Sequence, residues 1–139
     1  MSSFVWYNAP WGSIWGMRIF KNTWFSHFAD KEGITDGELV EAVNLLEAGQ
    51  ADDLGGGVYK MRLVRPGEGK SGGYRVIVFY RTEERTFFVY SFAKANRGNI
   101  SEKELRIFKK RAKIFISKND EEIRDDLRKR DLIEVPQEA

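Results

Sequence analysis

The 139-residue sequence contains no cysteine and a single histidine, His27. The absence of cysteine excludes disulfide scaffolds, thiolate zinc sites and cysteine nucleophiles. The lone histidine lies far in sequence from the basic residues described below, which argues against histidine-based catalysis. No apolar run reaches the roughly 18 to 20 residues of a membrane span, and the first seventeen residues lack the positive charge that opens a secretory signal. These absences lead us to expect a cytoplasmic protein.

The charge of the chain is nearly balanced overall but unevenly placed. The composition, 42% hydrophobic and 32% charged, is typical of one soluble domain that buries its own core. The formal net charge is only +2, yet fifteen Lys or Arg residues face five Asp or Glu residues between Val58 and Lys113. Because this window is predicted to fold into strands and a helix, it indicates a cationic surface, and a polyanion such as RNA is the natural partner.

The two ends of the sequence differ in composition from its middle. Residues 1–16 carry no charge, contain three tryptophans and are interrupted by proline and glycine. We predict an N-terminal extension at 1–16, a domain at 17–117 and a charged C-terminal extension at 118–139. A docked aromatic arm is the alternative for the first segment. In the last segment, residues 120–131 are expected to form a solvated helix and residues 132–135 a short strand or tail.

The first half of the domain alternates between strand and helix signals. Residues 18–21 are predicted to form a strand, and Asn22 is a suitable N-cap for the helix that follows. That helix is expected to turn three aromatic side chains to the core: Trp24, Phe25 and Phe28. Thr35 and Glu38 have the spacing of a capping box and predict a second helix that ends near Gly49.

A connection and three strands are predicted to follow. Residues 52–57 include three consecutive glycines, but no Lys-Ser pair closes a P-loop and the glycines precede a strand, so a plain connection is expected. Strands are predicted at residues 58–64, 74–81 and 86–94, the last two as a hairpin. Alternation places Lys60 and Arg62 on one face of their strand, and Phe88, Tyr90 and Phe92 on one face of the last strand.

A final helix is predicted after Ser101, which pairs with Glu104 in capping-box spacing. One side of this helix is apolar, and the other repeats four cations at helical spacing: Lys103, Arg106, Lys110 and Lys113. The predicted fold is therefore α+β, with an antiparallel sheet of about four strands, two N-terminal helices and a helix after the last sheet strand.

This order of elements resembles the RelE family within the RelE/ParE superfamily of bacterial toxins, over residues 17–116. The resemblance is carried by the stretches MRIFKNTWFSHFADKEGIT, GKSGGYRVIVFYR and FFVYSFAKANRGNIS. It implies the toxin of a type II toxin-antitoxin pair, which is neutralised by a small antitoxin and cuts mRNA on the translating ribosome.

Cleavage of RNA needs no metal or cofactor, because the 2′-hydroxyl can attack the adjacent phosphorus while preorganised cations stabilise the developing negative charge. Arg75 is the first candidate to hold the scissile phosphate, since a guanidinium presents paired donors. Lys60 and Arg62 come next. For proton transfer the candidates are Tyr90, Lys94 and Lys60; we favour Tyr90 or Lys94, and the residues alone do not decide between these two.

Other cations are expected to bind RNA without taking part in the chemistry. Arg65, Lys70 and Arg97 lie in predicted loops, and the four cations of the last helix are expected to contact ribosomal RNA or an acidic antitoxin segment. Two alternatives remain. ParE members of the superfamily bind and inhibit DNA gyrase instead, and a plain RNA-binding module would stack bases on Phe88, Tyr90 and Phe92. The basic residues together with Tyr90 favour the nuclease.

Overall fold

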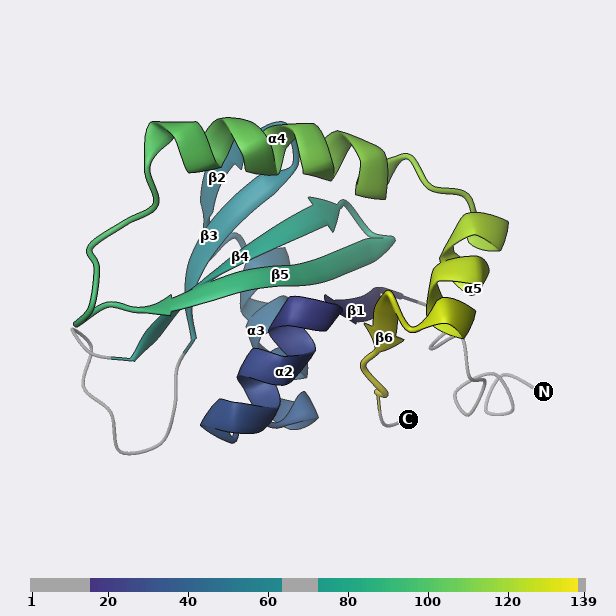
Figure 1. Ribbon diagram of the computed structural model, residues 1–139, viewed down its shortest axis with the longest axis horizontal. Helices are drawn as coiled ribbons and strands as arrows, with labels where there is room; N and C mark the ends of the chain where they lie inside the picture. Colours follow the sequence, from purple (N-terminus) through teal and green to yellow (C-terminus); the bar gives the residue numbers. More distant parts are fainter. Residues whose placement is uncertain (1–15, 64–72, 138–139) are drawn as a thin grey trace.

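Six strands form a single mixed sheet in the computed structural model, which describes residues 16–63 and 73–137 (Figure 1). The strand order is β2-β3-β4-β5-β1-β6, and β1 pairs with β5 in parallel while the other pairs are antiparallel. The strands span β1 Arg18–Asn22, β2 Asp52–Gly55, β3 Val58–Leu63, β4 Tyr74–Arg81, β5 Arg85–Ala93 and β6 Leu132–Glu134. The predicted α+β class is confirmed, but the sheet is larger than the expected four strands and not wholly antiparallel.

One of the additional strands, β2, explains the three consecutive glycines. Gly55, Gly56 and Gly57 all have positive φ angles, of 91°, 65° and 85°, and they turn the chain from β2 into β3. Such angles are readily adopted only by glycine. At Gly57, a Cβ atom would also lie 2.2 Å from Cδ1 of Ile116. The glycines therefore form a hairpin turn and allow close packing against the last long helix.

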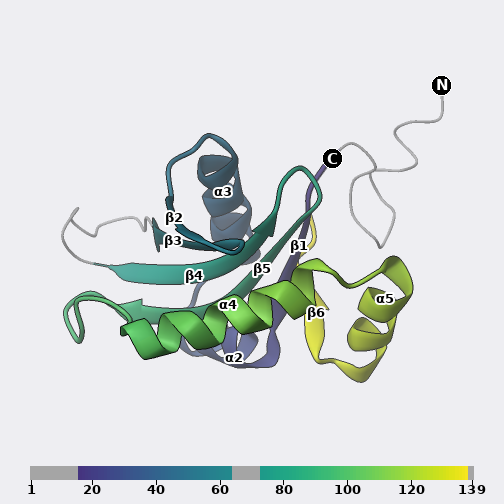
Figure 2. The same cartoon turned by 90° about the horizontal axis from the view of Figure 1, so that it is seen from above.

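Four helices are present in the described residues: α2 Thr23–Glu32, α3 Asp36–Glu47, α4 Glu102–Ile116 and α5 Asp120–Lys129. The predicted caps are confirmed, since Asn22 accepts from the backbone N–H of Phe25, and both predicted capping boxes form. Figure 2 shows α3 and α4 on opposite sides of the sheet. Within these ranges, no helix has the length and apolar character needed to cross a membrane.

The core has two parts, one on each side of the sheet. The part next to α2 and α3 contains Phe25, Leu39, Val43, Met61 and Phe88. The part next to α4 and α5 is lined with aromatic rings, and its buried members include Phe20, Phe79, Phe87, Ala112 and Ile123. Both faces of the central strands are thus buried over much of their length, which leaves the strand ends to carry polar side chains.

The chain after Ser117 adds to the same sheet. Strand β6 pairs with β1, and the backbone N–H of Val135 donates to the carbonyl of Ile19 at 2.8 Å. The Arg18 guanidinium donates to both carboxylate oxygens of Glu134 at 2.8 and 2.9 Å. Within the predicted extension 118–139, α5 and β6 lie where a helix and a short strand or tail were expected, and they bury two apolar side chains in the core next to α4: Ile123 and Leu132.

Two side-chain orientations differ from the prediction. The pairing of β4 with β5 shifts register between Ile77 and Val78, because Tyr90 pairs with Ile77 and Phe88 pairs with Val78. This bulge places Phe88 in the core next to α2, while Tyr90 packs against the core next to α4, so the prediction that they share a face is wrong. Trp24 was expected in the core as well, but 45% of its surface is exposed.

Candidate functional site

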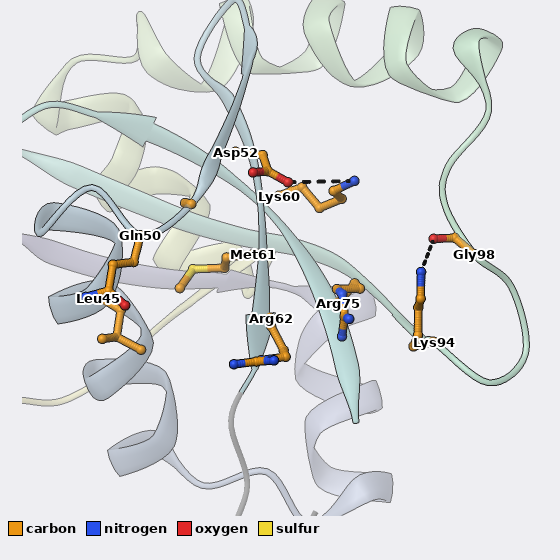
Figure 3. A pocket seen from close by; sticks show the side chains of 10 residues that line it. Leu45, Gln50, Asp52, Lys60, Met61, Arg62, Arg75, Lys94 and Gly98 are labelled. Carbon is orange, nitrogen blue, oxygen red and sulfur yellow. Dashed lines mark hydrogen bonds and ion pairs between the residues drawn. The ribbon is translucent and has the colours of Figure 1, made fainter. Parts of the chain in front are cut away.

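An open pocket of about 310 Å³ lies where the central strands begin or end, and four cations line it. Figure 3 shows Lys60 and Arg62 on β3, Arg75 on β4, and Lys94 just after β5 beside the loop that carries Gly98. We call these four residues and the space between them the cation pocket. The remaining lining residues come from α3, the chain around β2, and β3: Leu45, Gln50, Ala51, Asp52 and Met61.

Strand register explains why cations distant in sequence meet in this pocket. Arg62 pairs with Arg75 across β3 and β4, and Arg75 pairs in turn with Phe92 on β5. Directly paired residues project from the same face of a sheet, so the two arginines lie side by side. Lys94 follows Phe92 by two residues, and its backbone N–H donates to the carbonyl of Gly73 at 3.1 Å, which extends the pairing by one step.

The two lysines of the pocket are held by oxygen atoms of nearby loops. Lys60 Nζ donates to Oδ1 of Asn99 at 3.2 Å and lies 3.9 Å from Oδ2 of Asp52. Lys94 Nζ donates to the carbonyl of Gly98 at 3.4 Å. The loop between β5 and α4 therefore supplies an oxygen atom to each of the two ammonium groups, and through Asn99 it reaches β3.

Tyr90 lies beside the cation pocket but is not part of its lining. Its ring packs between Trp24, with centroids 4.8 Å apart, and Phe108, with centroids 5.7 Å apart. Its hydroxyl oxygen accepts from Nη1 of Arg97 at 3.4 Å. Because Arg97 Nε also donates to the carbonyl of Asn99 at 3.1 Å, Tyr90 and Lys60 are connected through the same loop.

Arg97 is engaged mainly within the chain. Its guanidinium donates to both carboxylate oxygens of Glu104, at 3.2 and 2.5 Å, and lies 5.4 Å from the ring centroid of Phe92. The hydrogen bond from Arg97, followed by one from the backbone N–H of Ser101, lowers the pKa of Glu104 to about 2. This ion pair ties the loop to the first turn of α4 and covers the hydroxyl of Tyr90.

The structure places the other predicted site residues apart from the cation pocket. The four predicted cations of α4 are all exposed and do not line the pocket: Lys103, Arg106, Lys110 and Lys113. Arg65 and Lys70 lie outside the described residues. Asn99 and Asp52, which contact Lys60, were not predicted. The glycine hairpin after Asp52 was the signal for β2, while nothing local in the sequence indicates that Asn99 reaches β3.

No group of three or more His, Asp or Glu residues is placed to hold a metal ion within residues 16–63 and 73–137. A comparison with models of protein families matches residues 17–135 to the family described as the RelE toxin of the RelE / RelB toxin-antitoxin system. A comparison with curated proteins gives no significant match. The family match includes α5 and β6, in agreement with the pairing of β6 with β1 and with the burial of Ile123 of α5 in the core.

Proposed function

The chain belongs to the RelE toxin family of toxin-antitoxin systems, and from this premise we propose that it inhibits translation by cutting mRNA on the ribosome. Membership implies a cognate antitoxin as partner. The observation that carries the proposal is the cation pocket, in which side chains from β3, β4 and the end of β5 converge on one open site. A phosphodiester with a neighbouring 2′-hydroxyl fits this arrangement of charge.

The proposed reaction is an internal transfer of the phosphoryl group. The 2′-oxygen forms a bond to phosphorus, the bond from phosphorus to the 5′-oxygen breaks, and the products end in a 2′,3′-cyclic phosphate and a 5′-hydroxyl. One proton leaves the 2′-hydroxyl and one is delivered to the departing 5′-oxygen. The phosphoryl oxygens gain negative charge in the transition state, and fixed cations stabilise that charge more than they stabilise the bound substrate.

Arg75 is the proposed clamp for the scissile phosphate. It occupies the central strand of the pocket, pairs with Arg62 on β3, and its guanidinium can donate two parallel hydrogen bonds to a phosphate. Lys60 supplies a compact charge whose position is set by Asn99. Removal of one such contact typically costs on the order of 3 kcal/mol of transition-state stabilisation.

The group that moves the proton is proposed to be Lys94, with Tyr90 as the alternative. Lys94 lines the pocket and its Nζ is held by a neutral carbonyl oxygen. Tyr90 is within the same loop network, but its hydroxyl already accepts from Arg97, and its ring is enclosed by Trp24 and Phe108. As a base, Tyr90 would act beside the Arg97 guanidinium that donates to its hydroxyl oxygen.

The test is single-turnover cleavage of mRNA on purified ribosomes, with the same RNA alone as a second substrate. We expect wild-type protein to produce fragments with 2′,3′-cyclic phosphate ends, and Arg75→Ala to cut about a hundredfold more slowly. Arg81→Ala is the matched control, because Arg81 lies on the same strand but at its opposite end, where it pairs with Glu84. Equal rates for the two variants would contradict the proposal.

A parallel assay separates the nuclease from gyrase inhibition. Gyrase supercoiling of relaxed plasmid is measured with the wild-type protein and with Arg75→Ala. The proposal expects intact supercoiling in both cases. Inhibition of supercoiling together with uncut mRNA would replace the nuclease with gyrase binding of the ParE type.

A further inference from the structure

A second pocket, of about 280 Å³, lies between the start of α2, the sheet and α4. Four aromatic rings and an aliphatic side chain form most of its lining, together with one amide and one guanidinium. We call it the aromatic pocket, and its residues are Asn22, Trp24, Phe79, Val89, Phe108, Arg111 and Phe115. Among the residues that the structure describes, it shares no lining residue with the cation pocket.

The exposure of the Trp24 side chain is not explained by packing of α2 on the sheet. Its ring stacks on Phe28 at 5.3 Å and 10°, and it contacts Tyr90, yet 45% of its surface is exposed. A tryptophan that served only to dock α2 on β5 would bury most of its ring, as Phe25 of the same helix does. The exposed part of Trp24 forms one wall of the aromatic pocket, and Phe108 of α4 lines the pocket as well.

Tyr90 relates the aromatic pocket to the cation pocket, because it contacts residues of the first and shares a row of the sheet with Lys60 of the second. Lys60, Ile77 and Tyr90 form one row across β3, β4 and β5, and the Tyr90 ring contacts both Trp24 and Phe108 of the aromatic pocket. Neighbouring strands lie about 5 Å apart, so the backbone of Tyr90 is about 10 Å from that of Lys60. A strand of RNA that enters the cation pocket needs only a few nucleotides to reach the second pocket.

The chemistry of the lining favours one kind of occupant. Aromatic walls stack on the flat face of a nucleobase, and an exposed arginine at the same site can bind a backbone phosphate or stack on the base. Arg111 is exposed. The amide of Asn22 is already engaged, because its oxygen accepts from the N–H of Phe25 and its nitrogen donates to the carbonyl of Val89 at 3.2 Å.

We propose that the aromatic pocket binds a nucleobase of the RNA strand whose scissile phosphate lies in the cation pocket, an inference that rests on the proposed function. Trp24 and Phe108 form the walls and Arg111 holds the nucleotide from the rim. Since the one amide in the lining is committed to the backbone, the pocket recognises a base by its face and discriminates little between the four bases.

The test is a double-mutant cycle between protein and RNA. Single-turnover cleavage on programmed ribosomes is measured for wild type and Trp24→Ala, on intact mRNA and on mRNAs with one abasic nucleotide at each position flanking the cut. We expect Trp24→Ala to slow cleavage of intact mRNA about five- to a hundredfold, and one abasic position to slow the wild type similarly. At that position the two changes together should cost no more than either alone.

Two further variants keep the test independent of folding. Trp24→Phe preserves an aromatic wall and should retain most of the activity, and Arg111→Ala, an exposed position, should show the same coupling to the abasic nucleotide as Trp24→Ala. Ile114→Ala is the matched control, because Ile114 is an exposed apolar residue of α4 outside both pockets. Thermal unfolding of each variant is recorded alongside.

The possible failures are distinguishable. If wild-type protein does not cut mRNA at all, both the proposed function and this inference fall. If it cuts, but the effects of Trp24→Ala and Arg111→Ala are additive with base removal at every position, only the nucleobase pocket is overturned. Loss of neutralisation by the antitoxin in Trp24→Ala, with unchanged cleavage, would also overturn it and assign the pocket to a side chain of that protein.

Discussion

The two ends of strand β4 carry arginines with very different surroundings. At its C-terminal end and across the turn, Arg81 pairs with Glu84 at 2.8 Å and Arg85 pairs with Asp120 at 2.7 Å. Both also donate to backbone carbonyls, Arg81 to that of Ile116 at the end of α4 and Arg85 to that of Lys118 in the connection to α5. At the N-terminal end, Arg75 lines an open pocket with three other cations.

The difference shows that a count of charges does not identify a binding surface. Both groups belong to the same basic stretch between Val58 and Lys113, but the arginines near the β4–β5 turn connect the sheet to the chain that leaves α4. One of them, Arg85, is neutralised by a carboxylate from outside the stretch, Asp120. Position along the strand thus separates arginines that connect the sheet to the end of α4 and the residues after it from an arginine that lines the cation pocket.

The largest expected effect is on the rate of mRNA cleavage and concerns the cation pocket at the N-terminal end of β4. Lys94→Ala should slow single-turnover mRNA cleavage at least a hundredfold, because general acid–base groups contribute about 10²- to 10⁴-fold. Tyr90→Phe, which keeps the ring between Trp24 and Phe108, should slow it less than tenfold. The measurement is the single-turnover rate from pH 6 to 9 for both variants.

The reverse order of the two effects would make Tyr90 the proton-transfer group and remove Lys94 from that role. Lys118→Ala is a useful control for Lys94→Ala. Lys118 is also a lysine in a loop next to a helix, but its Nζ pairs with Asp126 and lies 5.3 Å from the Phe115 ring centroid, far along the chain from the cation pocket. Its substitution should change stability and leave the cleavage rate of the folded protein intact.

The next effect is on the free energy of unfolding and concerns Arg85, near the turn between β4 and β5. Arg85→Ala should lower the free energy of unfolding by about 2 kcal/mol, because hydrogen bonds to a charged group are worth about 1.5 to 3 kcal/mol and the Arg85 side chain is only 7% exposed. Urea unfolding followed by circular dichroism measures this change. At temperatures where the variant is folded, its cleavage rate should match the wild type. If Arg85→Ala lowered the cleavage rate without lowering the free energy of unfolding, Arg85 would act in cleavage, and the two ends of β4 would not differ in role.

Much of the fold was predictable because local signals were strong. The three caps at Asn22, Thr35 and Ser101 have side chains that bond the backbone within three residues, and β4 spans the predicted residues 74–81. The two missed features depend on strand pairing. Strand β2 was expected as a plain connection and is formed by its pairing with β3, and the bulge near Val89 is formed by the pairing of β5 with β4.

The candidate site was predictable in part for the same reason. Alternation placed Lys60 and Arg62 on one face, and the structure brings them to one pocket with Arg75 and Lys94. Sequence reasoning could not reveal that Arg97 binds Glu104 through both carboxylate oxygens, since a loop cation looks the same whether it faces solvent or the chain. It also misplaced Trp24, which is 45% exposed, because helical periodicity does not fix how far the buried face extends at the first turn of a helix.

A smaller effect tests whether the pocket depends on its loop. Asn99→Ala removes the oxygen that holds Lys60 Nζ, and it should slow cleavage about fivefold, which corresponds to about 1 kcal/mol for one hydrogen bond. Asn96→Ala, in the same loop, is the control. If Asn99→Ala leaves the cleavage rate unchanged, the hydrogen bond from Lys60 Nζ to Asn99 is not needed for cleavage. The loop would then not be required to position the cations of the pocket.

The smallest effect concerns the ion pair between Arg97 and Glu104. The pKa of Glu104 is about 2 in the folded protein because Arg97 donates to it, compared with 4.5 for the unperturbed group. A lowered folded-state pKa stabilises the fold above pH 4.5, and this contribution is lost as the pH falls toward 2. Since Glu104 is 34% exposed, solvent screening limits this contribution to below about 1 kcal/mol.

Glu104→Gln keeps the capping-box hydrogen bond but removes the charge, so the stability of this variant should change less between pH 5 and pH 3 than that of the wild type. An unchanged pH dependence, measured by urea unfolding, would mean that the ion pair between Arg97 and Glu104 contributes nothing measurable to stability.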